Sequence, residues 1–220
     1  MTPVKRVVAE GVGTALLLAA IVGSGIMGER LAAGNVAIAL LANSIATGAA
    51  LVSLILAFDP ISGAHFNPLV TLWAADQRIL PWRDTSSYVA AQLVGAALGV
   101  VAAHAMFAEP IVSTSTHVRS GFPQALSECV ATFGLIGVIS GSRAKPEIVP
   151  FAVGAYIASA YWFTASTSFA NPAVTVARAL TGTFSGIRVV DVPPFVAAQM
   201  VGALSAVLLF RWLSPETPRG

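Results

Sequence analysis

Long apolar runs alternate with short polar segments along this chain. Six stretches approach the roughly 20 residues that a helix needs to cross a hydrocarbon core of about 30 Å. The run over 148–177 is longer than one span needs and shorter than two, so only its first part is assigned to a span. The pattern predicts transmembrane helices over residues 11–28, 35–58, 86–108, 120–142, 148–164 and 192–210.

Two further apolar segments are too short to cross a membrane and carry no charged residue: 60–75 and 165–177. Each contains an Asn-Pro pair, Asn67-Pro68 in the first and Asn171-Pro172 in the second. Asparagine is a favoured N-cap and proline suits the first helical position, so a helix begins at each pair. The predicted helices, 68–75 and 172–180, are about 12–13 Å long at 1.5 Å per residue. They are half-helices.

An internal repeat supports this division. Three landmarks recur in the same order in both halves. Glu10 with Thr14 corresponds to Glu128 with Thr132, the first Asn-Pro pair to the second, and residues 90–96 to residues 197–203. They predict one domain over 1–220, with half-repeats over 4–108 and 120–213. Each half has three spans, an odd number, so the second half inserts upside down. Paired short segments in inverted repeats indicate a site near the bilayer midplane.

The composition agrees with a membrane protein. Hydrophobic residues make up 56% of the 220 residues, charged residues only 10%, and the mean hydropathy is +0.80. Soluble domains carry about 25% charged residues, which excludes a soluble enzyme. The net charge of +2 is too small to indicate a nucleic-acid partner. Neither a catalytic constellation nor a metal-ligand cluster stands out, so the sequence predicts no enzyme, no metal site and no cofactor.

The distribution of Lys and Arg predicts the orientation. Eight lie on one side and four on the other: Lys5, Arg6, Arg78, Arg83, Arg143, Lys145, Arg211 and Arg219, against Arg30, Arg119, Arg178 and Arg188. The positive-inside rule therefore places both termini in the cytoplasm. His104 and His117 are expected near the outer surface without a specific role.

The two half-helices predict a pore for small uncharged molecules. Irregular backbone at membrane depth is tolerated where it lines a watery cavity. The N-terminal ends of both half-helices carry partial positive charge and would meet near the midplane. Asparagine amides there can donate hydrogen bonds to a neutral solute, while a cation meets an electrostatic barrier.

The motif Ser62-Gly63-Ala64-His65-Phe66-Asn67-Pro68, together with Asn171-Pro172-Ala173 and six spans, resembles the aquaporin and aquaglyceroporin superfamily of major intrinsic proteins. The resemblance covers about residues 4–213. It implies an all-α bundle of six transmembrane helices with two re-entrant half-helices, assembled as a homotetramer in a bacterial inner membrane. Its partners would be water, small neutral solutes and lipid.

Two residues depart from the pattern of the family. Leu69 follows the first Asn-Pro pair, where relatives have alanine, and should perturb the packing of the half-helices. Val174 stands where most relatives carry the arginine of the selectivity filter. Without that arginine the constriction is wider and more apolar. The resemblance then indicates glycerol or metalloid hydroxides such as arsenous acid as the solutes that pass.

The remaining filter positions follow from counting along the family pattern. The resemblance assigns Thr47, Ser168 and Val174 to the filter, and either Ser159 or Tyr161, of which Tyr161 is favoured. Arg178 lies four residues beyond Val174, on the same helical face. It either reaches back and replaces part of the missing charge, or anchors the helix at the lipid headgroups.

Intramembrane carboxylates are functional by default. Glu10 and Glu128 could relay protons, or could hold the re-entrant loops by accepting hydrogen bonds, as the family suggests. His65 could be a pH-dependent gate or a residue that fixes the loop. The alternatives to a passive solute channel are a water-selective aquaporin, a proton-coupled transporter that uses both glutamates, and a structural protein with a sealed pore.

Overall fold

The computed structural model describes residues 2–213, so Arg219, one of the charges used to predict orientation, lies outside the described residues. The described chain is all-helical, with eight α-helices and two short 3-10 turns. The elements are α1 (Pro3–Leu31), α2 (Val36–Ser62), α3 (Pro68–Asp76), α4 (Trp82–Phe107), α5 (Phe122–Ser142), η1 (Pro146–Ile148), α6 (Val149–Phe163), α7 (Pro172–Arg178), η2 (Val189–Asp191) and α8 (Val192–Leu213).

The six predicted spans correspond to α1, α2, α4, α5, α6 and α8. Five of these helices are long and apolar enough to cross a membrane, and α6 is shorter, with 15 residues. At 1.5 Å per residue, α6 is about 22 Å long. It ends at Phe163 because Thr164 turns to an extended conformation, with φ −111° and ψ 140°, and leads the chain back into the bundle.

Both half-helices begin where the sequence predicts. Their ends differ slightly, since α3 extends one residue further than expected, to Asp76, and α7 ends at Arg178 instead of residue 180. Beyond Arg178 the chain tightens: the N–H groups of Ala179 and Leu180 bond the carbonyls three residues back, at 3.2 and 3.0 Å. Such turns are frequent at helix ends.

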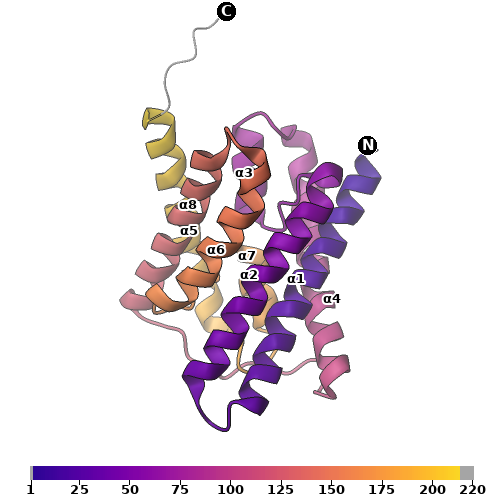
Figure 1. The fold of residues 1–220 in the computed structure, drawn as a ribbon, viewed down its shortest axis with the longest axis vertical. Helices are drawn as coiled ribbons and strands as arrows, with labels where there is room; N and C mark the ends of the chain where they lie inside the picture. The colour runs from indigo at the N-terminus through magenta and orange to yellow at the C-terminus, as the bar shows by residue number, and fades with distance from the viewer. Residues whose placement is uncertain (1, 214–220) are drawn as a thin grey trace, which may run out of the picture.

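The helices pack so that each half-helix is held by the other half of the chain as well as its own. Helix α3 contacts α4 and α8, and α7 contacts α8, α4 and α1. The start of α1 and the end of α8 lie at the same end of the bundle, here called the terminal end (Figure 1). Large apolar side chains such as Val94, Leu98 and Leu204 face outward, as a lipid environment requires.

Close helix contacts depend on two glycines at equivalent places in the repeated segments. A Cβ on Gly95 would collide with the carbonyl of Gly11, where α4 crosses α1. A Cβ on Gly202 would collide with the carbonyl of Cys129, where α8 crosses α5. Small residues at such crossings let membrane helices approach closely.

Candidate functional site

The two asparagines cap the half-helices. Asn67 Oδ1 accepts the backbone N–H of Leu69 at 2.9 Å, and Asn171 Oδ1 accepts that of Ala173 at 2.9 Å. Pro68 and Pro172 lack the N–H that would have no partner at the first helical position. Because each Oδ1 is used as a cap, the amide Nδ2 of each asparagine points to the opposite side.

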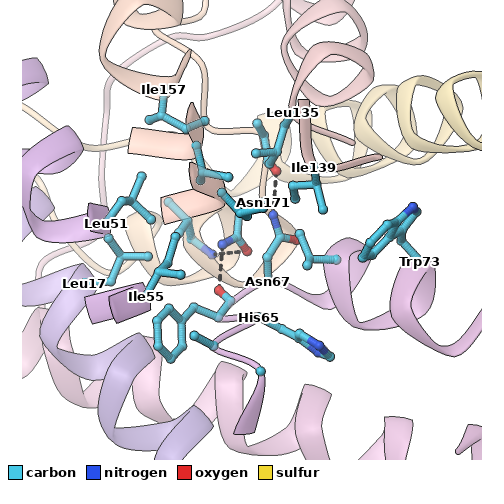
Figure 2. Close-up of a pocket in the computed structure, with 18 of the residues that line it drawn as sticks. Leu17, Leu51, Ile55, His65, Asn67, Trp73, Leu135, Ile139, Ile157 and Asn171 are labelled. Atoms are coloured by element: carbon cyan, nitrogen blue, oxygen red, sulfur yellow. Dashed lines mark hydrogen bonds between the residues drawn. The ribbon is translucent and has the colours of Figure 1, made fainter. Parts of the chain in front are cut away.

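Each amide also donates across to the other re-entrant loop (Figure 2). Asn67 Nδ2 donates to the carbonyl of Ala170, and Asn171 Nδ2 donates to that of Phe66, both at 2.8 Å. An NH2 group has two hydrogens, so one donor on each asparagine remains for a solute. Both asparagines line the same cavity. The predicted pore motif therefore comes together, with both helix N-termini directed at one place.

Leu69 lies behind this point. Its side chain is 5% exposed and packs in the apolar core, and it is not among the residues that line the cavity. The cap on its own N–H is intact, and the effect of leucine on the packing of the half-helices stays a prediction.

Glu10 holds the first re-entrant loop. Its Oε1 accepts the hydroxyl of Ser62 at 2.7 Å and the N–H of His65 at 2.9 Å, and its Oε2 accepts the N–H of Phe66 at 2.8 Å. Gln92 Nε2 donates to Oε2 as well, at 2.8 Å. Four donors thus satisfy one fully buried carboxylate, which compensates its removal from water.

Glu128 holds the second loop in the same way. It accepts the N–H groups of Phe169 and Ala170, both at 2.9 Å, and Gln199 Nε2 at 2.6 Å. Ser168 and Ala170 have positive φ angles of 49° and 48°, a conformation that costs free energy outside glycine. The carboxylate stabilises this strained backbone. Neither Glu10 nor Glu128 is among the residues that line the cavity.

His65 fixes its loop through a donated hydrogen bond. The Thr71 hydroxyl donates to the carbonyl of Asn67 at 3.1 Å, so the 3.2 Å contact between His65 Nδ1 and Thr71 Oγ1 has the histidine as donor. The other face of the imidazole stands 5.4 Å from the Tyr88 ring, centroid to centroid. His65 also lines the cavity, on the terminal side of Asn67.

A cavity of about 250 Å³ runs past both asparagines. It reaches from Asp59 and Arg143 near the terminal end to Arg178 on the other side of the midpoint. One wall is aliphatic, as Figure 2 shows around the two asparagines; it comprises Leu17, Leu51, Ile55, Leu135, Ile139 and Ile157. The cavity is therefore lined by both polar groups and aliphatic side chains.

The residues assigned to the filter gather in this cavity. Thr47 Oγ1 and the Tyr161 hydroxyl are 3.2 Å apart, both buried and both lining it. Ser159 is exposed and its hydroxyl bonds the Tyr156 carbonyl, so of the two residues left open by counting, Tyr161 is the one that faces the lumen. Val174, 3% exposed, lines the cavity too.

Ser168 offers a hydroxyl to the lumen. The residue is 2% exposed and lines the cavity, and its Oγ has no hydrogen-bond partner among the described residues. A buried hydroxyl without a partner costs free energy. A solute in the cavity would supply that partner.

Arg178 is buried at the end of α7. It is 2% exposed, lines the cavity, and donates from Nε to the carbonyl of Ser185. Its guanidinium lies over the Phe169 ring, with Cζ 3.4 Å from the centroid. A side chain so fully covered does not reach lipid headgroups, so the interpretation of Arg178 as an interfacial anchor is wrong.

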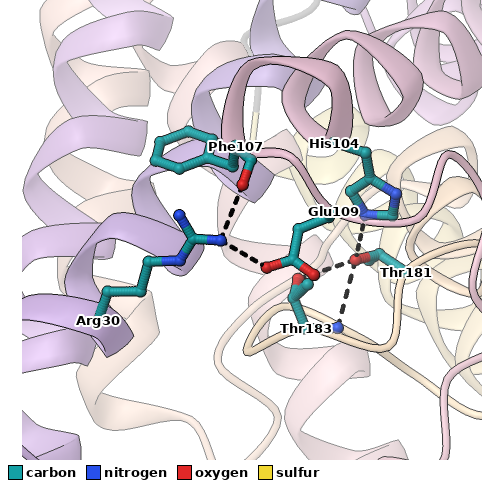
Figure 3. A network of polar contacts seen from close by, with 6 residues as sticks. All are labelled: Arg30, His104, Phe107, Glu109, Thr181 and Thr183. Carbon is teal, nitrogen blue, oxygen red and sulfur yellow. Dashed lines mark hydrogen bonds and ion pairs between the residues drawn. The ribbon is translucent and has the colours of Figure 1, made fainter.

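The segment after α7 is tied to α4 by a buried histidine (Figure 3). His104 Nε2 lies 2.8 Å from Thr181 Oγ1, and His104 Nδ1 lies 3.1 Å from the carbonyl of Ile111. Since a carbonyl only accepts, Nδ1 carries the hydrogen in this contact. His104 is 0% exposed, so the expectation of a surface residue without a role is wrong. It helps to fix the chain that follows Arg178.

Residues 1–149 and 144–219 match the family described as Major intrinsic protein. The chain is a major intrinsic protein. It is 55% identical over 216 residues to Aquaglyceroporin AqpS of Rhizobium meliloti (strain 1021), an alignment that covers 97% of this chain and 92% of the relative. It is 35% identical over 208 residues to Aquaporin NIP1-1 of Zea mays, covering 89% of this chain and 71% of the relative.

The fold of this major intrinsic protein matches a solved structure, that of the aquaglyceroporin from Plasmodium falciparum. The TM-score is 0.75 at 18% sequence identity, over 96% of this chain and 95% of that one. The predicted all-helical membrane fold is thereby confirmed. Membership of this family makes the chain a membrane channel for small neutral solutes and not an enzyme. No group of three or more His, Cys, Asp or Glu that could hold a metal occurs within residues 2–213.

Sequence reasoning about this major intrinsic protein missed one residue beside the filter. Arg119, in the segment before α5, donates to the carbonyls of Gly186 and Ser166, at 2.8 and 3.0 Å. Loss of hydration lowers the pKa of its guanidinium from the ordinary value. An arginine in an outer loop has no local pattern that marks such a contact, since its partners lie 47 and 67 residues away in the chain.

Proposed function

We propose that this major intrinsic protein conducts glycerol and metalloid hydroxides such as arsenous acid, together with water, down their gradients. The observation that carries the proposal is the cavity itself: paired amide donors at Asn67 and Asn171, and a valine at position 174. An arginine there would bring up to five donors and a fixed charge. With Val174 in its place, we infer a filter that admits solutes larger than water.

The two-sided lining of the cavity supports this choice of solute. A polyol or a metalloid hydroxide has hydroxyl groups that can bond Asn67, Asn171 and Ser168. Its other surface can rest against the aliphatic wall. Thr47 supplies a hydroxyl and Tyr161 an aromatic ring, at the filter positions that the family pattern assigns to them. The filter therefore comprises Thr47, Tyr161, Ser168 and Val174.

The glutamates are better explained as loop supports than as proton carriers. In all the hydrogen bonds given above, Glu10 and Glu128 are the acceptors. Four of the donors are backbone N–H groups of the re-entrant loops. The carboxylate oxygens are thus used to fix the backbone of the two loops, and neither glutamate lines the cavity. We therefore propose passive conduction without proton coupling.

The arrangement of the channel in its membrane completes the proposal. We infer half-repeats over 4–108 and 120–213, a homotetramer with one pore per subunit, and a bacterial inner membrane with both termini in the cytoplasm. Seven of the eight charges that support this orientation lie within the described residues. The end of the bundle opposite the terminal end then faces outward.

The experiment that tests the function measures swelling of proteoliposomes in stopped flow. Purified protein is reconstituted, and the vesicles are challenged with gradients of glycerol, arsenous acid or a non-permeant sugar. We expect glycerol and arsenous acid to enter several times faster than into protein-free vesicles. Osmotic water flux accompanied by no entry of either solute would identify a water-selective channel and overturn the proposal.

A cysteine substitution tests the position of the filter. Ser168→Cys is expected to make solute flux sensitive to a mercurial reagent, because a thiol in the constriction binds mercury and blocks the lumen. The unmodified channel should be blocked weakly, since its one cysteine, Cys129, does not line the cavity. Ser159→Cys is the matched control and should remain as insensitive as the unmodified protein. Equal block of both variants would contradict the assignment.

A further inference from the structure

Two guanidinium groups lie over one phenylalanine ring beside the outer part of the cavity. Arg178 Cζ lies 3.4 Å from the centroid of the Phe169 ring, and Arg119 Cζ lies 5.0 Å from it. Both distances are within the range of about 6 Å over which a cation is attracted to a ring face. The two arginines come from different elements, the end of α7 and the segment before α5, and meet only through the fold.

Neither guanidinium forms a close ion pair with an acidic side chain. Among residues 2–213, no ion pair within 4.0 Å includes Arg119 or Arg178. Their partners are backbone carbonyls, which orient the groups without cancelling the charge. Asp191 forms an ion pair with Arg188, at 2.9 Å. From Arg119 it accepts the backbone N–H and not the guanidinium. Arginine keeps its proton at neutral pH, so both guanidinium groups stay charged.

The other end of the cavity lacks this arrangement. Phe169 stands two residues before Asn171, and the corresponding residue in the first half is His65, two before Asn67. Arg178 stands seven residues after Asn171, where the first half has Ala74. Ala74 and His65 both line the cavity, but the pair of arginines occurs at one end only. The charged residues that line the terminal end are Arg143 and Asp59, of opposite sign, so the two ends of the lumen differ in their charge.

We propose that Arg119, Phe169 and Arg178 together form a cation barrier that replaces the charge missing at Val174. The inference deepens the proposed function and rests on it, because it explains how a filter wide enough for bulky neutral solutes still excludes cations. Charge in a poorly solvated site acts over several ångströms, so the barrier does not need to occupy the constriction. The ring of Phe169 contacts both guanidinium groups and so brings them to the same place beside the cavity.

The roles of the three residues differ. Arg178 lines the cavity and acts on a permeating cation directly. Arg119 is absent from the lining and adds its field from behind Phe169. It also donates to the carbonyl of Ser166, at 3.0 Å, and so positions the loop that carries Ser168. A neutral solute lacks the net charge that the two guanidinium groups repel, so the barrier acts on cations far more than on glycerol.

The test compares cation and glycerol permeability in proteoliposomes of the whole protein. Proton entry is followed with an internal pH-sensitive dye under a potassium diffusion potential, and methylammonium entry by swelling. The double variant Arg119→Gln with Arg178→Gln is expected to admit both cations at least about tenfold faster than the unmodified protein, with the single variants in between. Glycerol entry should change much less than cation entry, because glycerol carries no net charge.

Two controls separate charge from structure. Arg30→Gln removes a positive charge from α1, where the side chain is 50% exposed and paired with Glu109, and should leave cation permeability unchanged. Arg119→Lys with Arg178→Lys keeps both charges without the guanidinium geometry, and should restore exclusion. A double Gln variant that conducts glycerol normally yet admits no more cations than the unmodified protein would overturn the proposal.

A measurement on the unmodified protein guards against a variant that does not fold. The barrier predicts proton and methylammonium permeability equal to that of protein-free vesicles despite Val174, and a cation leak in the unmodified protein would overturn it. The proposed function fails separately, if glycerol does not enter. Cation entry can still be compared between the variants and the unmodified protein in that case. The comparison needs only that the variants are folded, which is checked by matching elution in size-exclusion chromatography.

Discussion

Replacing Val174 with arginine is expected to lower glycerol and arsenous acid flux at least severalfold while water flux persists. Val174 lines the cavity at 3% exposure, on the first turn after the Asn171 cap. A guanidinium there occupies much of the space between the polar and aliphatic walls and presents up to five donors. Water can pass such a site in single file, whereas a polyol loses the room that it needs. Stopped-flow swelling of matched proteoliposomes measures both fluxes.

The size and the charge of the new side chain need to be separated. Val174→Leu adds one methylene group without donors or charge and is expected to leave the ratio of glycerol to water flux close to that of the unmodified channel. A Val174→Arg channel that carries glycerol as fast as the unmodified one would show that position 174 does not set the width of the filter.

Replacing Glu10 with glutamine is expected to destabilise the protein strongly. The carboxylate accepts four hydrogen bonds, from Ser62, His65, Phe66 and Gln92. An amide turns one acceptor into a donor that faces donors. Each buried polar group left without a partner costs about 1–3 kcal/mol, so the total is several times that of an ordinary surface substitution. The expected result is a large drop in the temperature at which the detergent-solubilised protein aggregates, with loss of flux.

Glu128→Gln should behave alike, since Glu128 accepts three hydrogen bonds from the second loop and Gln199. Glu147→Gln, an exposed change in η1, is the matched control and should have little effect. A Glu10→Gln protein that is as stable as the unmodified one, and that differs only in how its transport responds to pH, would favour the proton-coupled transporter.

The sequence predicted the half-helices well because the signals that begin them are local. An asparagine cap followed by proline is complete within two residues, and the structure uses both features at Asn67 and Asn171. The glutamates could be predicted as loop supports only through the family resemblance, because their partners lie more than 40 residues away. Counting left Ser159 and Tyr161 open, since the length of the connecting loop shifts the register.

The errors concern residues whose surroundings are set by distant segments. Arg178 could not be separated from a headgroup anchor by sequence, because Phe169 and Ser185 cover it only after the loops fold back. His104 is buried by Ile111 and Thr181, of which the second is 77 residues away. The burial of Leu69 in the apolar core likewise depends on packing that no local pattern encodes.

The central claim is that neutral solutes move passively along the lumen between Asn67 and Asn171. Glycerol entry into proteoliposomes, recorded in stopped flow with and without a protonophore at matched protein density, tests it most directly. The account predicts entry well above that of protein-free vesicles, at a rate that the protonophore does not change. Entry that falls to the protein-free level when the proton gradient is collapsed, or no excess entry under either condition, would contradict it.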